Sequence, residues 1–173
     1  MERLLLRLTA ELPAKIIMDG DRPYLERYYL GRAFGLIWYI HRFVASDPDR
    51  GLHDHPWRRA ISLVLRGWYL EETRLGTRVV RWINLIGGAD FHRVVLPDER
   101  SVWTLFGHSE VKHPKGWGFL RREWDAEKEA HMLVYRSHVD RDDSGDSAAW
   151  VATAPKGRDL RAPLRTATTR AAS

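Results

Sequence analysis

The sequence predicts an all-β fold built as a single antiparallel β-barrel, and three observations point to it. Short runs of β-branched and aromatic residues recur along the chain, which is typical of strands. Glycine-containing turns separate several of these runs. The runs follow at near-regular spacing, without the intervening helices of a parallel sheet, which favours a sandwich or barrel. A chain of 173 residues is long enough for one domain with a hydrophobic core.

The expected elements can be placed in chain order. Strands are expected at residues 14–18, 23–30, 34–44, 60–65, 68–72, 77–86, 91–96, 101–106 and 116–122. Tight turns are expected at Gly67 and Gly87. Minor helical segments are expected near the two ends of this domain, at residues 2–11 and at 124–135, where alanine, glutamate and lysine favour a helix.

The composition narrows the chemistry that the chain can perform. It has no cysteine, which excludes disulfides, thiolate metal sites and a thiol nucleophile. A bound metal must therefore be held by nitrogen and oxygen ligands. Neither a glycine-rich phosphate-binding loop nor a Gly-x-Ser-x-Gly motif is present, which argues against nucleotide-binding proteins and serine hydrolases. The 8 tryptophans can fill a core or line a pocket, and composition does not separate these uses.

The chain divides near residue 141 into a folded body and a tail. Residues 1–141 are expected to form the barrel domain, and residues 142–173 a polar, basic tail that is disordered from about Lys156, because it has few large apolar residues to bury. The net charge of +5 is attributed to this tail and to scattered surface arginines. Nucleic acid is a partner that the tail allows but that the pattern does not favour. No apolar stretch approaches membrane length, and the N-terminus does not resemble a signal peptide, so a cytoplasmic protein is expected.

The most informative segment contains the sequence Gly-Leu-His-Asp-His-Pro-Trp. His53 and His55 stand two residues apart, so on a strand their side chains project from the same face. The same pair on a helix would point about 200° apart. A strand therefore places two imidazoles side by side, as a metal ion requires. Asp54 should point away from the pair and orient a neighbouring loop.

His92 is the third expected ligand. It begins a strand directly after the Gly87 turn, and folding back of the intervening hairpins would bring it beside the first pair. Three neutral imidazoles leave open positions for water or substrate, which is characteristic of catalytic rather than closed structural sites. His53, His55 and His92 are therefore the expected catalytic and metal-binding residues.

These residues carry a resemblance to the cupin superfamily. The stretch from His53 and His55 to Gly67 resembles the first cupin motif, and the segment around His92 resembles the histidine of the second. The resemblance covers roughly residues 34–117 and implies a cupin-type jelly-roll barrel. Small uncharacterised bacterial and phage cupin proteins share the wider pattern. The superfamily includes dioxygenases, isomerases, epimerases, decarboxylases and pure binding proteins, so no single reaction is implied.

The sequence departs from the first cupin motif at its glutamate, whose position is taken by Ala60. Cupin iron sites with three histidines and no carboxylate resemble thiol dioxygenases, in which substrate supplies the remaining ligands. A carboxylate could instead be recruited from Glu71, Glu72 or Asp90. Among these carboxylates Glu72 is the first choice for a fourth metal ligand, since it lies on the strand after Gly67, although the position favours a solvated hairpin end slightly.

Other polar residues are weaker candidates. His41 is either an outer partner of the site or a satisfied core histidine. His108 and His113 flank an expected loop and should be exposed. Four arginines have side chains that suit carboxylate or phosphate binding, although most are expected to be surface charges. They are Arg58, Arg59, Arg81 and Arg93.

Three functions remain open on this basis. The first is an Fe(II)-dependent oxygenase acting on a small molecule, with zinc, nickel and manganese as alternative metals. The second is a metal-independent sugar epimerase or isomerase with a histidine as general base and a tyrosine as acid. The third is a small-ligand-binding module without catalysis. A homodimer is expected only from the general tendency of such folds to pair.

Overall fold

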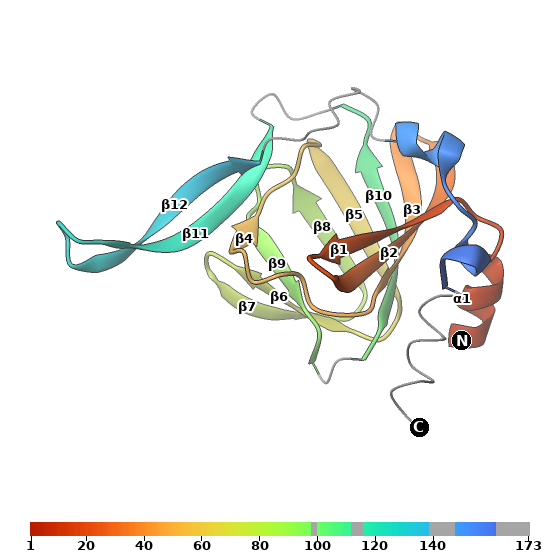
Figure 1. Cartoon of the computed structure of the whole chain (residues 1–173), viewed down its shortest axis with the longest axis horizontal. Helices are drawn as coiled ribbons and strands as arrows, with labels where there is room; N and C mark the ends of the chain where they lie inside the picture. The colour runs from red at the N-terminus through yellow and green to blue at the C-terminus, as the bar shows by residue number, and fades with distance from the viewer. Residues whose placement is uncertain (98–99, 112–115, 139–147, 162–173) are drawn as a thin grey trace.

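The chain folds as two six-stranded antiparallel sheets packed face to face (Figure 1). The computed structural model describes residues 1–97, 100–111, 116–138 and 148–161. In spatial order the first sheet contains β1 (Ala14–Asp19), β2 (Arg22–Ala33), β3 (Leu36–Phe43), β10 (Val102–Ser109), β5 (Arg59–Arg66) and β8 (Ile83–Gly87). The second contains β12 (Ala130–His138), β11 (Trp117–Asp125), β4 (Leu52–His53), β9 (His92–Val95), β6 (Tyr69–Thr73) and β7 (Gly76–Val80).

The all-β prediction is confirmed, and the prediction of a closed barrel is corrected to a jelly-roll sandwich. Closure would require hydrogen bonds between the edge strands of the two sheets. In the part of the chain that the structure describes, strands pair only within their own sheet, so each sheet keeps two edges. Side chains of the two inner faces fill the space between the sheets, as in other sandwiches.

The central strands are buried on both faces, which explains their nearly continuous apolar character. On β3, Ile37, Tyr39 and His41 face the interior of the sandwich, where Tyr39 packs in a core cluster with Phe106 of β10. Ile40 points to the opposite face and joins a second cluster beneath the N-terminal helix. Sequence alternation alone would have exposed one of these faces.

The predicted strand 77–86 is wrong as a single element, because it contains two strands that belong to different sheets. β7 pairs with β6, whereas β8 pairs with β5. The chain crosses between the sheets at Arg81 and Trp82, where Arg81 lies 4.9 Å from the centroid of the Trp68 ring. Neither residue is a turn signal, so nothing in the local sequence marks the crossing.

The predicted helix at 124–135 is also wrong, since this region forms the tip of the β11–β12 hairpin. Asp125 Oδ1 accepts hydrogen bonds from the backbone N–H groups of Glu127 (3.1 Å) and Lys128 (3.2 Å), and Glu129 adopts a left-handed φ of 47°. The helix-favouring residues therefore occupy a turn. Figure 1 shows the hairpin projecting from the body of the sandwich.

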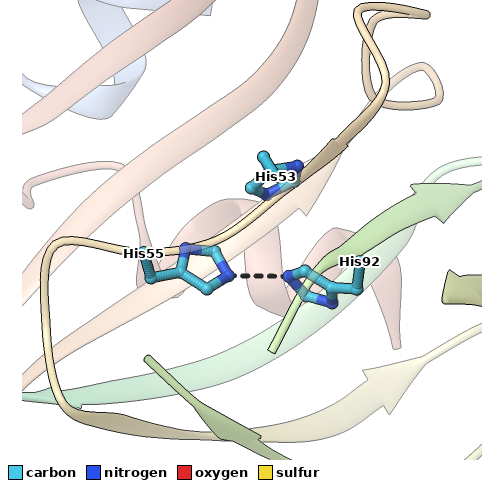
Figure 2. A group of neighbouring side chains, drawn as sticks. All are labelled: His53, His55 and His92. Atoms are coloured by element: carbon cyan, nitrogen blue, oxygen red, sulfur yellow. Dashed lines mark hydrogen bonds between the residues drawn. The ribbon is translucent and has the colours of Figure 1, made fainter. Parts of the chain in front are cut away.

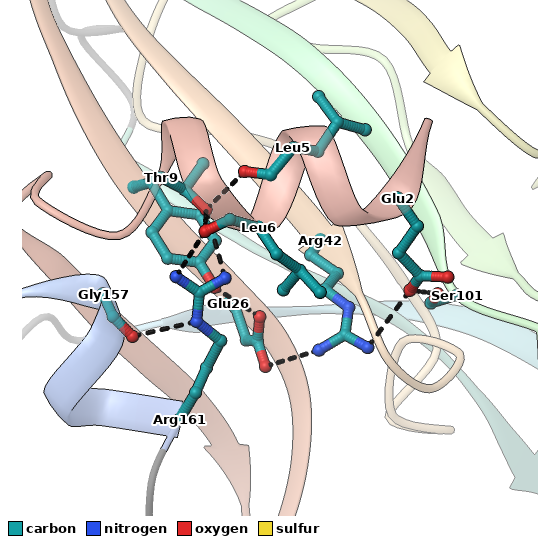
Figure 3. A network of polar contacts seen from close by, with 10 residues as sticks. Glu2, Leu5, Leu6, Thr9, Glu26, Arg42, Ser101, Gly157 and Arg161 are labelled. Carbon is teal, nitrogen blue, oxygen red and sulfur yellow. Dashed lines mark hydrogen bonds and ion pairs between the residues drawn. The ribbon is translucent and has the colours of Figure 1, made fainter.

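The N-terminal helix α1 (Glu2–Leu8) confirms the helix expected at the start of the chain and covers the outer face of the first sheet. A partly buried charge network joins them (Figure 3). Glu26 on β2 accepts hydrogen bonds from the Tyr28 hydroxyl (2.5 Å) and from Arg42 Nη1 (3.0 Å). Arg42 also pairs with Glu2 of the helix at 3.5 Å. Pairing of this kind is what allows a fully buried carboxylate such as Glu26.

The C-terminal segment packs against α1, which corrects the expectation of disorder from about Lys156 as far as residue 161. After the short helix η2 (Ala149–Thr153), Lys156 forms a β-bridge with Pro13. Arg161 is buried and donates to the backbone carbonyls of Gly157 and Leu6 and to Thr9 Oγ1, over distances of 3.0, 3.1 and 3.2 Å (Figure 3). Residues 142–147 and 162–173 of the expected tail lie outside the described residues.

The low apolar content of the tail was a poor guide because its few apolar residues, such as Trp150 and Leu160, pack against the core clusters and Arg161 adds hydrogen bonds to the helix. The Arg161 guanidinium also lies 5.3 Å from the centroid of the Tyr28 ring.

Among the described residues, none of the helices has both the length and the apolar character needed to cross a membrane bilayer.

Candidate metal centre

The three predicted histidines meet at one point in the second sheet (Figure 2). β4 and β9 are antiparallel neighbours, and their pairing places His53 directly opposite His92. Each pair among the three imidazole rings has a centroid separation of 4.9 Å. One ring nitrogen from each histidine lies within 4.8 Å of the other two. The arrangement is a triangle of nitrogen donors with the dimensions of a metal site.

His55 reaches the triangle from a loop rather than from a strand. β4 ends at His53, and the backbone N–H of His55 instead donates to the Gly88 carbonyl at 3.1 Å. Strand alternation predicted that Asp54 points away from the two histidines, and it does so even though His55 lies in a loop. Asp54 points away, and its Oδ1 accepts a hydrogen bond from the Gly118 N–H at 2.6 Å, so it ties the ligand loop to β11.

The start of the ligand loop requires glycine. Gly51 adopts a φ of 98°, in the left-handed region, and an added Cβ would lie 2.1 Å from the carbonyl oxygen of Leu120. Because β4 pairs with β11 at Leu52 and His53, this close approach sets the position of the first ligand.

Glu71 orients His92 from behind. Its Oε1 lies 2.7 Å from His92 Nδ1, and a carboxylate can only accept, so Nδ1 carries the proton and the lone pair of neutral His92 is on Nε2. That Nε2 atom lies 2.7 Å from His55 Nε2, so it faces the other histidines of the triangle. Glu71 therefore presents His92 in the tautomer that binds a metal through Nε2.

Glu71 is held as an anion by its other partners. Asn84 Nδ2 donates to Oε1 and Arg78 Nε donates to Oε2, both at 2.6 Å. Burial on its own would raise the pKa of Glu71, but hydrogen bonds from His92, Asn84 and Arg78 outweigh it and lower the pKa to about 2. The carboxylate is therefore charged near neutral pH.

Glu72, the carboxylate expected to join the ligands, does not lie with the three histidines. Side chains alternate along β6, so Glu72 and Glu71 face opposite sides of the sheet. Glu72 sits opposite Arg93 on β9 and pairs with its Nε at 3.0 Å. Asp90 is also removed from the site, because its Oδ2 accepts from the Gly87 N–H at 2.7 Å within the turn.

The imidazoles of His53 and His55 are held neutral by their surroundings. Burial, followed by the nearby His92, lowers the pKa of His53 to about 3. Burial, followed by His92 and His53, also lowers the pKa of His55 well below its usual value. Neutral imidazole is the form that binds metal, so these ligands need lose no proton near neutral pH.

The triangle opens into a cavity of about 480 Å³ between the two sheets. Aromatic side chains form much of its wall. The Trp57 ring stacks on His55 at a centroid distance of 3.8 Å and also on His108 at 5.4 Å. Phe106 stacks on His41 at 4.7 Å. The cavity therefore combines apolar walls with a few polar groups, as ligand pockets do.

Sequence reasoning missed several polar groups of this cavity, among them His108 and Arg27. His108 was expected to be exposed but is 3% exposed, because β10 continues to Ser109, three residues beyond the predicted strand. Arg27 on β2 lines the cavity and was not considered, since the four arginines singled out lie elsewhere. His41 is buried and accepts a hydrogen bond from Arg27. His113 lies outside the described residues.

Neither a known protein family nor a curated protein matches the sequence. The fold does match solved structures. DMSP lyases align with a TM-score of 0.50 at 11% identity, over 64% of this chain and 63% of theirs. The Fe(II) form of HppE aligns with a TM-score of 0.48 at 13% identity, over 57% of this chain and 56% of that one.

A sugar phosphate isomerase of the cupin superfamily from Silicibacter pomeroyi aligns with a TM-score of 0.46 at 13% identity, over 68% of this chain and 82% of that one. The chain spans little more than half the length of HppE. At these identities the likenesses concern the fold alone.

Proposed function

We propose that the protein binds one divalent transition metal ion through His53, His55 and His92 and acts on a small molecule, as an Fe(II)-dependent oxygenase. The observation that carries the proposal is the triangle of three ring nitrogens within 4.8 Å of one another. Imidazole is a good ligand for iron, and also for zinc, nickel and copper, so the ligand type favours this group of metals over magnesium or calcium.

The donor set fits such an ion. The three histidines leave the cavity side of the triangle open, where substrate can approach. His92 already has its lone pair on Nε2 through Glu71. Glu71, rather than Glu72, is the carboxylate in contact with a ligand, and its role is to position His92. A bound Fe(II) ion would supply the redox chemistry that an oxygenase needs.

The surrounding side chains exclude water and orient the ligands. Trp57 covers one face of His55 by stacking, which limits rotation of the imidazole. Phe119 lies 6.3 Å from the His53 ring and closes the side toward β11. A small substrate entering this cavity would therefore meet the open side of the triangle in largely apolar surroundings.

Metal analysis of protein purified without an affinity tag tests the proposal. We expect close to one transition ion per chain after reconstitution with Fe(II) under anaerobic conditions. Alanine variants of His53, His55 and His92 should each lose most of the metal while remaining folded. His131→Ala is the matched control, because it removes an exposed histidine of the hairpin and should keep full occupancy.

Results contrary to these expectations would change the function assigned to the protein. Full occupancy in all three alanine variants, or no metal in reconstituted wild type, would contradict metal binding at this site. The remaining interpretations would then be a metal-independent epimerase or isomerase, with a cavity histidine as general base, or a binding module without catalysis.

A further inference from the structure

Arg27 is an arginine whose side chain enters the cavity without a carboxylate partner. It lies on β2 directly opposite His41 of β3, and its Nε donates to His41 Nε2 at 3.1 Å. Its guanidinium carbon lies 5.2 Å from the centroid of the Tyr39 ring. One N–H group is therefore used and one face is stacked, while the terminal nitrogens, which form the fork that recognises oxyanions, have no carboxylate to bind.

The lack of an ion-pair partner sets Arg27 apart from other arginines of this region. Arg42, on the outer face of the same sheet, pairs with Glu26 and Glu2. Arg50, which also lines the cavity, pairs with Asp19. Among the described residues, by contrast, no carboxylate lies within ion-pair distance of Arg27. Removing a guanidinium from bulk water without a counter-charge costs free energy. A buried arginine without an ion-pair partner therefore normally has a functional role.

The charge balance of the cavity is positive. Arg50 lines it but is balanced by Asp19; of the other lining residues that the structure describes, Lys15 and Arg27 are the basic ones and Asp47 is the one acidic residue. Asp47 is already engaged, since its Oδ2 accepts a hydrogen bond from the Val94 N–H at 2.8 Å. A dication on the three histidines would increase the positive charge further. The interior is thus electrostatically suited to an anion.

Arg27 and the three histidines face the same cavity from opposite sheets. Arg27, His41 and His108 belong to the first sheet, while His53 and His92 belong to the second. The stacked rings of His55, Trp57 and His108 bridge the two groups. The positive charge of Arg27 also contributes, after burial and the neighbouring histidines, to the lowered pKa of His55.

We propose that Arg27 binds the anionic group of the substrate, a small organic oxyanion with a carboxylate or phosphoryl group, while the rest of that molecule faces the three histidines. The assignment rests on the proposed function, because it names the substrate class of the same site. A cavity of about 480 Å³ limits the substrate to a small molecule, and its aromatic walls suit an apolar body between the two polar ends.

Anion titrations test this assignment. Inorganic phosphate and acetate are added separately to the metal-free full-length chain, so that the anion cannot bind through a metal. Binding is followed by tryptophan fluorescence, since Trp57 and Trp150 line the cavity. We expect saturable binding of at least one anion to wild type, and at least about tenfold weaker binding to Arg27→Gln, the loss typical of one charge-assisted hydrogen bond.

The control is Arg50→Gln, which removes the same charge from the same cavity but from an arginine already paired with Asp19, and which should bind the anion as wild type does. If Arg27→Gln does not fold, Arg27→Met removes the charge at similar length and takes its place. Absence of anion binding in wild type, equal affinity in the Arg27 variant, or equal losses in the Arg27 and Arg50 variants would overturn the assignment.

The metal content of the same variants separates this inference from the proposed function. Loss of anion binding in Arg27→Gln with metal fully retained supports both. Anion binding that depends on Arg27 in a wild type that binds no metal would support the anion site and contradict the metal site. Full metal binding, with no effect of the Arg27 substitution on the binding of either anion, would support the metal site and contradict the anion site.

Discussion

At the scale of single residues, the centre depends on which of two neighbouring glutamates faces inward. Glu71 contacts His92, and Glu72 pairs with Arg93 on the other side of the sheet. We predict that Glu71→Gln weakens metal affinity about 10- to 100-fold, because the amide no longer fixes the tautomer of His92. Competition with a metal-binding chelator of known affinity measures the change.

Glu72→Gln is the matched control for this substitution, since it alters the same chemical group one residue away. Its metal affinity should stay within about twofold of wild type, as expected for a partly exposed ion pair outside the site. A similar loss in both variants would show that β6 acts through general stability rather than through His92.

The buried histidines outside the triangle give a prediction about acid stability. Burial, partly offset by a hydrogen bond to the Ser109 carbonyl and reinforced by Arg27, lowers the pKa of His108 to about 4. The unfolded chain takes up this proton near pH 6.5, whereas the folded chain does not until about pH 4. Stability should therefore be fully present above about pH 6.5 and decrease as the pH falls from there toward 4.

Urea unfolding of the metal-free protein between pH 7 and pH 5 measures this slope. His108→Gln should reduce it by up to about 1.4 kcal/mol per pH unit, the contribution of one proton. His131→Gln, at an exposed position of the hairpin, should leave it unchanged. An unaltered slope in the His108 variant would contradict the assignment of a buried neutral imidazole.

The three histidines of the candidate site were predictable from the sequence, whereas their neighbours were not. The spacing of His53 and His55 and the position of His92 after a glycine turn indicated a shared site, and the structure brings the three together. The choice between Glu71 and Glu72 depends on strand register, and a register shift of one residue reverses the face. No local pattern fixes that register.

At the scale of elements, sequence patterns placed most strands but not the connections between sheets. The strand predicted at 77–86 is continuous in composition, yet the chain changes sheet within it. The residues that favoured a helix near 126–130 form a hairpin turn instead, because pairing of β11 with β12 overrides a weak helix propensity. Both errors arise from long-range pairing that a local window does not contain.

The C-terminal segment provides the element-scale prediction. Arg161→Ala should reduce the free energy of unfolding by about 2 kcal/mol, because it leaves buried acceptors at Gly157 and Thr9 without their donor. Arg158→Ala is the control: this exposed arginine pairs with Glu11, and its removal should cost less than about 0.5 kcal/mol. Denaturant unfolding compares the two variants.

Truncation before residue 157 extends the same test to the whole segment. The backbone there is tightly packed, since a Cβ on Gly157 would lie 2.2 Å from the Thr9 carbonyl oxygen. We expect the truncated chain to unfold at lower denaturant concentration than wild type. Unchanged stability in both the truncated chain and Arg161→Ala would mean that the segment contributes nothing in solution.

At the scale of the whole molecule, the polar side chains of the site come from both sheets of the sandwich. The second sheet carries His53 and His92, which lie opposite each other on β4 and β9, and His55 follows in the loop. The first sheet carries Arg27, His41 and His108. A ligand between the sheets can therefore contact both groups only if the sandwich is intact, which couples the binding of substrate to the fold.

The last prediction follows from how a metal would join these parts. An ion on the three histidines would cross-link β4, its following loop and β9, all within one sheet. Binding to the folded state alone stabilises it by mass action, by about 2.7 kcal/mol when free metal is 100 times the dissociation constant. Wild type should therefore melt at a clearly higher temperature with metal than without it, whereas His53→Ala should melt at one temperature under both conditions.

The melting temperatures of the metal-free proteins test whether the ion is needed for folding. Because the core clusters around Tyr39, Trp103 and Tyr69 lie outside the triangle, metal-free His53→Ala should melt close to metal-free wild type. A wild type that fails to fold without metal would show instead that the ion is structural. Equal stabilisation of wild type and His53→Ala by metal would place the bound ion elsewhere on the chain.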